Sequence, residues 1–183
     1  MKKSIRYISI LRGINVGGHR KIKMFDLKAM YESMGFTEVI TYIQSGNVLF
    51  NSDTTDPNQL AQNIKNAIQN KFGFDVPVII RTMNELQQVI TNNPFAQVPD
   101  FDEKKLYVTF LSEAIKVTNR QAIQPHEYLP DRFEIIGEHI YVYYAEKISN
   151  SKLIQSFFEK KYNVTATTRN WNSVNKLYDL AKE

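Results

Sequence analysis

The sequence of 183 residues contains no cysteine and no hydrophobic run long enough to cross a membrane. Without cysteine, disulfide bonds, thiolate metal sites, cysteine nucleophiles and thiol redox chemistry are excluded, and a reducing compartment is expected. Lys2 and Lys3 precede an apolar stretch, but Arg6 and Arg12 interrupt it, so we interpret this stretch as a strand and not as a signal peptide. The sequence therefore predicts a cytoplasmic protein that does not enter a membrane.

Acidic residues are missing from positions 1–25, which makes the charge distribution one-sided. The whole chain has a net charge of +4, whereas this segment alone holds seven lysines and arginines. Such asymmetry favours an anionic partner, and a solvated basic edge is the alternative explanation. The seven residues are Lys2, Lys3, Arg6, Arg12, Arg20, Lys21 and Lys23.

Hydrophobic periodicity predicts the same order of elements in both halves of the chain. The first half is expected to contain a strand at 4–12, a helix that includes 27–34, a hairpin of 37–44 and 47–51, a helix capped by Asp56 and ending before Gly73, a strand at 76–81 and a helix at 84–90. The second half is expected to contain a strand at 105–111, a short helix at 118–124, a hairpin of 133–136 and 139–144, a helix at 151–161 that buries Leu153, Ile154, Phe157 and Phe158, a strand at 163–168 and a helix at 171–182.

This order predicts an α+β protein made of two tandem ferredoxin-like (βαββαβ) plaits, each followed by an extra helix. The two halves overlay at an offset of about 88 residues, which aligns Arg81 with Arg169 and indicates an internal duplication. The predicted domains are 1–93 and 105–183, separated by a proline-containing linker at 94–104.

Glycine-rich turns of the first half are expected to meet at one edge of its sheet. In a βαββαβ plait each crossover helix returns the chain, so the loop after the first strand lies beside the hairpin. We therefore expect a binding site in which backbone amides of the glycines, together with Arg12 and Lys21, contact a small anionic or phosphate-bearing ligand, conceivably a nucleotide. Asn15, Ser45 and Asn47 would orient this ligand. The glycines concerned are Gly13, Gly17, Gly18 and Gly46.

The glycine spacing in this loop is neither the GxGxxG dinucleotide fingerprint nor a Walker loop. No Ser, Thr, Asp or Asn precedes Met24 as a cap, and Asp26 in the first turn would itself occupy the positive end of the following helix. A long connection whose glycines relieve strain therefore remains the alternative to a phosphate site.

Three separated motifs resemble one bacterial family. They are RGINVGG (12–18), TYIQSGNVLF (41–50) and TTRNWNSVNKL (167–177), supported by KMFDLKAMYESMGF (23–36) and GFDVPVIIR (73–81). Together they are similar to the family catalogued as domain of unknown function 1697, over nearly the whole chain. The resemblance implies paired α/β plaits and implies no activity.

Arg169, Asn170 and Trp171 lie between the last predicted strand and the last helix. Arg169 could bind an anion or a carboxylate, with Asn170 as a polar contact. The structural alternatives are an ion pair or interdomain bridge for Arg169, a cap of the last helix by Asn170 or Asn172, and a core anchor for Trp171.

Catalytic and metal-binding patterns are not found. Pro130 stands where an HExxH motif beginning at His126 needs its second histidine, and the three histidines have no ligand spacing. We therefore expect no metal and no cofactor, and whether the chain is an enzyme stays open.

Two other functions remain open. A nucleic-acid-binding protein could use the basic sheet edge and stack bases on Tyr107, Tyr141 and Tyr143, if these share one sheet face, with Tyr7 and Phe50 as poorer counterparts in the first half. Burial of these aromatics between packed layers is the alternative. A homo-oligomeric interaction module, in which the motif residues serve packing, is the third candidate.

Overall fold

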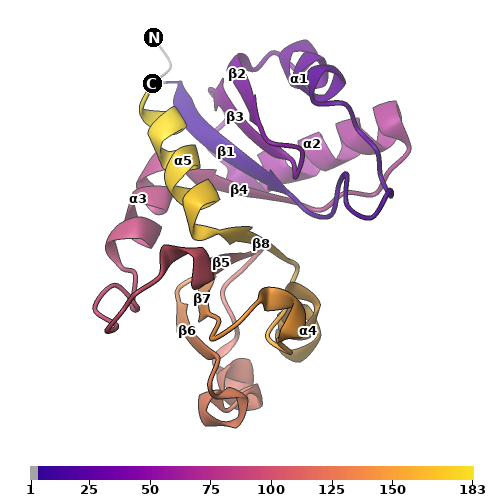
Figure 1. Cartoon of the computed structure of the whole chain (residues 1–183). Helices are drawn as coiled ribbons and strands as arrows, with labels where there is room; N and C mark the ends of the chain where they lie inside the picture. The colour runs from indigo at the N-terminus through magenta and orange to yellow at the C-terminus, as the bar shows by residue number, and fades with distance from the viewer. Residues whose placement is uncertain (1–3) are drawn as a thin grey trace. The chain divides into compact units, whose positions relative to one another are not determined.

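The structure is a computed structural model that describes residues 4–183, apart from the side chains of Arg120 and Gln121. Lys2 and Lys3 of the basic segment lie outside the described residues. Within the described part the chain is α+β, with two four-stranded antiparallel sheets and five α-helices (Figure 1). It divides into two compact units, Met1–Gln87 with Leu177–Glu183 (unit 1) and Gln88–Lys176 (unit 2).

Unit 1 is built on a sheet of strand order β2-β3-β1-β4, in which every neighbouring pair is antiparallel. The central strand β1 pairs its Ile8 with Leu49 on one side and with Arg81 on the other. The elements are β1 (Ile5–Leu11), α1 (Met24–Ser33), β2 (Thr37–Tyr42), β3 (Asn47–Ser52), α2 (Pro57–Phe72), β4 (Val78–Thr82) and α3 (Met83–Thr91), which continues into unit 2.

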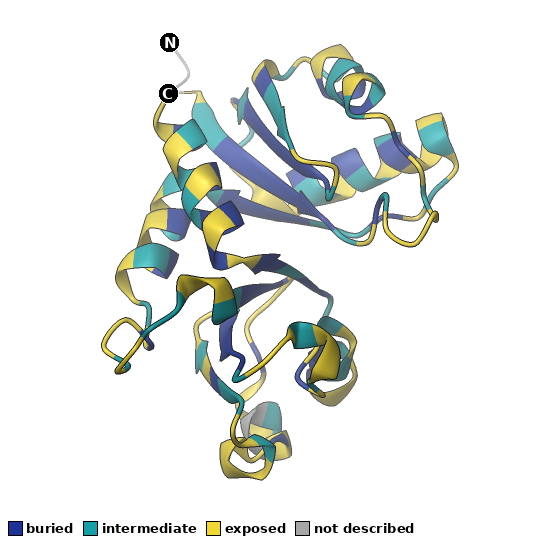
Figure 2. Ribbon diagram, in the orientation of Figure 1, coloured by how far each residue is buried: buried dark blue, intermediate teal, exposed yellow. Residues whose placement is uncertain are grey.

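Helices α1 and α2 pack on one face of this sheet and form the core of unit 1 (Figures 1 and 2). Tyr7 of β1 and Phe50 of β3 are fully buried there together with Ile64 of α2. The predicted ends of α2 are confirmed. Asp56 accepts from the amides of Asn58 and Gln59, Pro57 is the first helical residue, and Gly73 ends the helix with φ +74°.

Unit 2 is built on a sheet of order β6-β7-β5-β8, again with antiparallel neighbours. Its core packs α4 residues such as Phe158 and Tyr162 against Leu111 and Val142 of the sheet. The elements are β5 (Leu106–Leu111), β6 (Arg132–Ile136), β7 (His139–Tyr143), α4 (Gln155–Tyr162), β8 (Ala166–Asn170) and α5 (Trp171–Lys182), with short 3-10 helices η1 (Glu103–Lys105), η2 (Val117–Ala122), η3 (Pro125–Tyr128) and η4 (Ile148–Asn150).

Two predicted helices of the second half are wrong in detail. In place of an α-helix at 118–124 the chain forms the 3-10 helix η2, which ends at Ala122, and α4 begins at Gln155 and not at 151. Ser151 accepts from the Leu153 amide through its hydroxyl, which gives the backbone a local turn in place of a helical bond. Ile154, predicted to be buried, is 40% exposed because it precedes the first turn of α4.

Helices α3 and α5 each begin in one unit and end in the other. Within unit 1, Arg6 Nη2 donates to Leu180 O near the end of α5 at 3.5 Å. Within unit 2, the Tyr141 hydroxyl donates to Val89 O near the end of α3 at 2.9 Å. The domains predicted from sequence, 1–93 and 105–183, would keep both helices whole.

The segment predicted as a linker, 94–104, is packed against the sheet of unit 2. The rings of Phe95 and Phe101 each lie 5.7 Å from the ring of Tyr143, and the Tyr143 hydroxyl accepts from the Asp102 amide at 2.9 Å. Because an aromatic cluster holds it, this segment has fixed contacts in unit 2.

Candidate functional site

The glycine loop and the β2-β3 turn lie together at one edge of unit 1. The Leu11 amide, at the end of β1, donates to Gly46 O at 2.8 Å. The next amide, that of Arg12, donates to Pro77 O at 3.0 Å, just before β4 begins. Antiparallel pairing of β1 with both neighbours therefore fixes the start of the 12–23 loop beside the 43–46 turn, and we call these two segments the rim.

Asn15 ties the rim together. Its side-chain amide donates to Ile22 O and to Gln44 O, each at 2.9 Å, and its Oδ1 accepts from the Ile22 amide at 2.8 Å. One side chain thus closes the loop on itself and fastens it to the neighbouring turn. The φ of Asn15 is +55°, a left-handed conformation that asparagine tolerates better than most residues.

Gly17 and Gly18 form the tip of the loop. Val16 and His19 make an antiparallel bridge, and the His19 amide donates to Val16 O at 3.0 Å. The φ angles of the two glycines are +58° and +79°, and a type I′ turn needs positive φ at both central positions. The paired glycines therefore have a structural reason that does not depend on a ligand.

The 43–46 turn differs from the predicted one. The residues in left-handed conformation are Ile43 and Gly46, whereas Asn47 is already the first residue of β3. Asn47 is buried and donates from Nδ2 to Tyr42 O at 3.1 Å and to the Ser45 hydroxyl at 3.2 Å. From the sequence, the Gly46-Asn47 pair suits a tight hairpin turn with positive φ at both residues. Of this pair, the structure shows positive φ at Gly46 only, whereas the predicted connection of the two strands through Ser45, Gly46 and Asn47 is confirmed.

Several loop amides already donate within the protein. Those of Leu11, Arg12, Asn15 and His19 bind backbone carbonyl groups, and that of Ile22 binds the Asn15 side chain. A ligand at the rim would consequently depend on side chains more than on a backbone cradle. The N-terminus of helix α1 adds little to the binding of an anion. Its N-cap Lys23 makes no side-chain hydrogen bond, and the negative charge of Asp26 lies in its first turn.

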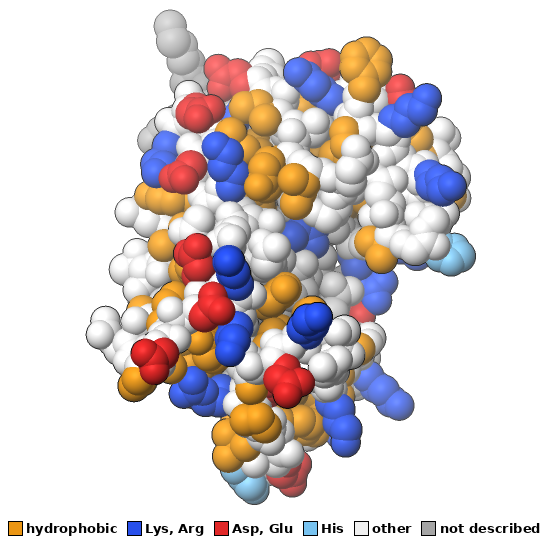
Figure 3. Space-filling model, viewed as in Figure 1, with side chains coloured by type: hydrophobic (Ala, Val, Ile, Leu, Met, Phe, Trp, Pro, Cys, Tyr) orange, Lys and Arg blue, Asp and Glu red, His pale blue; other side chains and the backbone are white. Residues whose placement is uncertain are grey.

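Basic side chains are gathered on this rim. Lys21, Lys23 and His19 are exposed, while Arg12 and Arg20 are partly buried, and Arg20 Nη1 donates to Arg12 O at 3.4 Å. Figure 3 shows basic side chains and a histidine along the edge of unit 1 that holds the loop. Arg6 is not part of this group, since it donates to Glu38 O at 2.8 Å at the opposite end of β1.

Comparison with known proteins places the chain. The model of a family described as "Protein of unknown function (DUF1697)" matches residues 5–141, which is most of the chain. The chain belongs to the DUF1697 family. No curated protein matches it significantly.

A solved structure has the same fold. The conserved bacterial protein SP0830 from Streptococcus pneumoniae superposes with a TM-score of 0.76 over 98% of this chain and 99% of the other, at 22% identity. At that identity the likeness shows a common fold and nothing about ligands. The predicted family is therefore confirmed, while its description names no activity.

Arg169 and Asn170 lie in unit 2, whereas the rim is in unit 1. Arg169 is buried on β8, and its Nη1 donates to the Thr167 hydroxyl at 3.0 Å and to Thr168 O at 2.9 Å. Burial lowers the pKa of Arg169 to about 10. Asn170 Oδ1 accepts from the Ser173 amide at 2.8 Å, so Asn170 is the one of the two candidates that caps α5, and Trp171 is buried.

The aromatic residues considered for base stacking do not share one open face. Tyr107 pairs with Val142 and Tyr141 pairs with Val108, so Tyr107 lies on the opposite face from Tyr141 and Tyr143. The predicted parity is wrong by one residue. Tyr7 and Phe50 are buried under α1 and α2, and Tyr141 is also buried, so none of these three rings is available to stack on a base.

A pocket in unit 2 was not foreseen from the sequence. It is lined by Lys104, Lys105 and Lys147 among others. The predicted topology was the one signal that could have indicated it, because antiparallel pairing brings the start of β5 beside the end of β7.

Metal ligands and membrane spans were searched among residues 4–183. No group of three His, Asp or Glu side chains there could hold a metal ion, and none of the helices has the length and apolar character of a membrane span.

Proposed function

We propose that each unit is a ferredoxin-like plait and that the chain arose by internal duplication. The corresponding strand orders β2-β3-β1-β4 and β6-β7-β5-β8 support this proposal. So does the equivalent position of the two buried arginines, since Arg81 pairs with Ile8 of the central strand β1 and Arg169 pairs with Val108 of the central strand β5.

We infer that the rim binds a small anionic or phosphate-bearing ligand, such as a nucleotide. The observation that supports this is the fixed gathering of basic side chains there, in a stretch from residue 4 to 25 that contains no Asp or Glu. Arg12 and Lys21 would contact the anion, and Asn15, Ser45 and Asn47 would keep the two segments in register. The absence of cysteine supports a cytoplasmic location for this activity.

Thermal unfolding with a ligand panel tests this function. Nucleotides, phosphosugars and polyphosphate are added to the protein, and a ligand at ten times its Kd should stabilise the fold by about 1.4 kcal/mol, or about 3–6 °C in Tm. The Arg12→Ala/Lys21→Ala variant should lose this shift. Lys71→Ala, which removes an exposed charge from α2, is the matched control and should keep it. If no compound in the panel moves Tm at millimolar concentration, the proposal is refuted.

Homo-oligomerisation is the second candidate, and exposed apolar residues on the rim and at the start of α1 favour it. Val16 is 62% exposed and Phe25 is 81% exposed, and both belong to the 12–25 segment. Light scattering should then report an oligomer that Val16→Ser/Phe25→Ser dissociates while the anion response survives. A basic surface for nucleic acid would instead give oligonucleotide affinity that falls steeply with salt.

A further inference from the structure

Unit 2 contains a pocket of about 760 Å³ between the start of β5 and the segment that follows β7. The two segments meet because these strands are antiparallel neighbours. Leu106 pairs with Tyr143, and the Tyr144 amide donates to Lys105 O at 3.0 Å. The pocket therefore lies at a defined end of the sheet, and its volume is within the range of about 300–1,000 Å³ usual for small-molecule sites.

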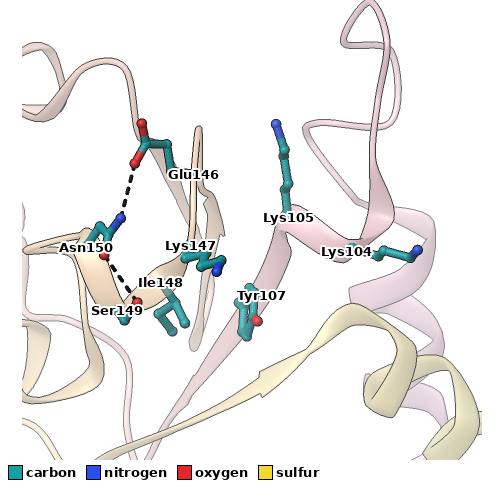
Figure 4. A pocket seen from close by; sticks show the side chains of 8 residues that line it. All are labelled: Lys104, Lys105, Tyr107, Glu146, Lys147, Ile148, Ser149 and Asn150. Carbon is teal, nitrogen blue, oxygen red and sulfur yellow. Dashed lines mark hydrogen bonds between the residues drawn. The ribbon is translucent and has the colours of Figure 1, made fainter.

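One part of the pocket wall is apolar and firmly held. Figure 4 shows the side chains of Tyr107 of β5 and Ile148 of η4 close to each other. Both pack against the core of unit 2, and the Tyr107 ring meets the Tyr144 ring edge-on with centroids 5.2 Å apart. A flat or apolar ligand group could pack against Tyr107 and Ile148 without rearrangement of the sheet.

Another part of the wall is positively charged. Lys104, Lys105 and Lys147 line the pocket with Glu146 as its one acidic residue. Glu146 Oε2 already accepts from Asn150 Nδ2 at 3.1 Å, so this carboxylate is held on its own segment. In Figure 4, Lys105 and Lys147 come from opposite sides of the pocket, and Lys104 points away from the 146–150 segment.

We propose that this pocket binds a phosphate monoester that bears a planar ring, of about mononucleotide size. Lys105 and Lys147 contact the phosphate from two sides, and Tyr107 and Ile148 contact the ring. Two ammonium groups match the charge of a phosphate monoester, and the volume exceeds what inorganic phosphate fills. This site lies in unit 2, separate in sequence and composition from the rim, and it does not depend on the function proposed for the rim.

Isothermal titration calorimetry with three probes tests the proposal. AMP carries both groups, adenosine has only the ring, and inorganic phosphate has only the anion. AMP should bind at least about tenfold more tightly than either fragment, because the two parts of the wall act on one molecule. Lys105→Ala/Lys147→Ala should weaken AMP about tenfold or more, as expected for lost charged hydrogen bonds. Lys160→Ala, which removes an exposed lysine of α4, is the matched control and should leave affinity unchanged.

A second pair of variants tests the ring contact. Tyr107→Phe keeps the ring and should keep AMP affinity, whereas Tyr107→Leu should weaken AMP severalfold and leave the binding of inorganic phosphate unchanged. Circular dichroism checks that each variant is folded. Equal affinity of AMP and phosphate, or equal loss for both in Tyr107→Leu, would overturn the assignment of the ring to Tyr107.

The rim variant separates this proposal from the function proposed above. Binding of AMP that persists in Arg12→Ala/Lys21→Ala and is lost in Lys105→Ala/Lys147→Ala supports the pocket. The reverse pattern assigns AMP to the rim and overturns the pocket proposal. Absence of AMP binding at millimolar concentration also overturns it, as does a single-stranded oligonucleotide that binds more tightly than AMP and depends on Lys105 and Lys147.

Discussion

At the scale of single residues, Gly46 determines how closely the two segments of the rim approach. A Cβ at this position would lie 2.7 Å from Ile14 Cδ1 and 2.9 Å from Leu11 Cβ, and its φ is +82°. Both the contact and the conformation exclude a larger residue. The close approach of the loop to the turn thus depends on the absence of a Cβ at position 46.

Gly46→Ala should therefore destabilise the fold by about 2–4 kcal/mol, the sum of left-handed strain and overpacking. Gly73→Ala is the matched control. Its φ is +74°, but a Cβ there would have nothing within 4 Å, so only about 1 kcal/mol should be lost. Urea unfolding measures both. Equal losses in the two variants would mean that Ile14 moves aside and that the close approach is not essential.

Asn15 illustrates what the sequence could not reveal at this scale. Its position in the glycine loop predicted a ligand contact, yet its amide is used by Ile22 O and Gln44 O. Whether a polar side chain faces a ligand or the protein's own carbonyl groups depends on the path of a loop rich in positive φ angles. Periodicity and glycine spacing do not determine that path.

At the scale of elements, variants of the α5 cap test whether Asn170 has a structural role. Asn170→Ala removes the acceptor of the Ser173 amide and should cost about 1 kcal/mol, whereas Asn170→Asp keeps an acceptor and should cost little. Asn172→Ala is the control for helix propensity, because Asn172 is exposed and lies in the first turn of α5. Chemical denaturation provides the measurement. A loss in Asn170→Asp as large as in Asn170→Ala would contradict the capping role.

Elements with strong periodicity and clear ends were predicted well from the sequence. The helix predicted at 171–182 agrees with α5, and α2 has the predicted cap and terminal glycine. Elements whose ends depend on local side-chain hydrogen bonds were predicted less well. Helix α4, for example, begins four residues later than predicted. Sheet parity also failed at Tyr107, because a shift of one residue reverses the face and the sequence pattern is apolar on both faces of β5.

The convergence of the rim could be predicted from topology alone, because it requires only that β1 and β3 be antiparallel neighbours. The unit 2 pocket depends on the same kind of neighbourhood, that of β5 and β7, but no glycine or turn motif marked it. In the sequence, the lysines that line this pocket cannot be distinguished from other solvent-exposed lysines, because only the fold brings them together around a cavity.

At the scale of the whole molecule, buried tyrosines govern stability in alkali. Burial raises the pKa of Tyr141 and Tyr162 to about 12, and burial also raises the pKa of Tyr31 and Tyr144. From about pH 10 upward the unfolded chain releases these protons while the folded chain retains them, so stability falls as pH rises. Arg169 has the opposite effect on stability. Burial lowers its pKa to about 10, so above that pH the unfolded chain retains this proton while the folded chain releases it.

Burial also raises the pKa of Tyr7 and lowers the pKa of Arg6. Because five tyrosines oppose two arginines, the urea midpoint should decrease from pH 10 upward. Absorbance at 295 nm should show that part of the tyrosine signal appears only together with unfolding. Tyr141→Phe should make the decrease less steep. A midpoint that rises with pH in this range would show that the five hydroxyls are not protected in the folded chain.

The two units should not be separable at the boundary predicted from sequence. The fragment 105–183 lacks the end of α3, where Val89 accepts from Tyr141, and lacks Phe95 and Phe101, which pack on Tyr143. We expect poor dispersion of its amide NMR signals and better dispersion for the fragment 88–176, which keeps these contacts. A well-dispersed spectrum of 105–183 would contradict the division into compact units.

The division of α5 between the units also has a consequence for biosynthesis. Unit 1 includes residues 177–183, whereas unit 2 ends at Lys176. A ribosome translating this message therefore exposes every part of the later unit before the earlier one is complete. The contacts of residues 1–87 with the end of α5, such as the bond from Arg6 to Leu180 O, therefore form only after the whole of unit 2 has been synthesised.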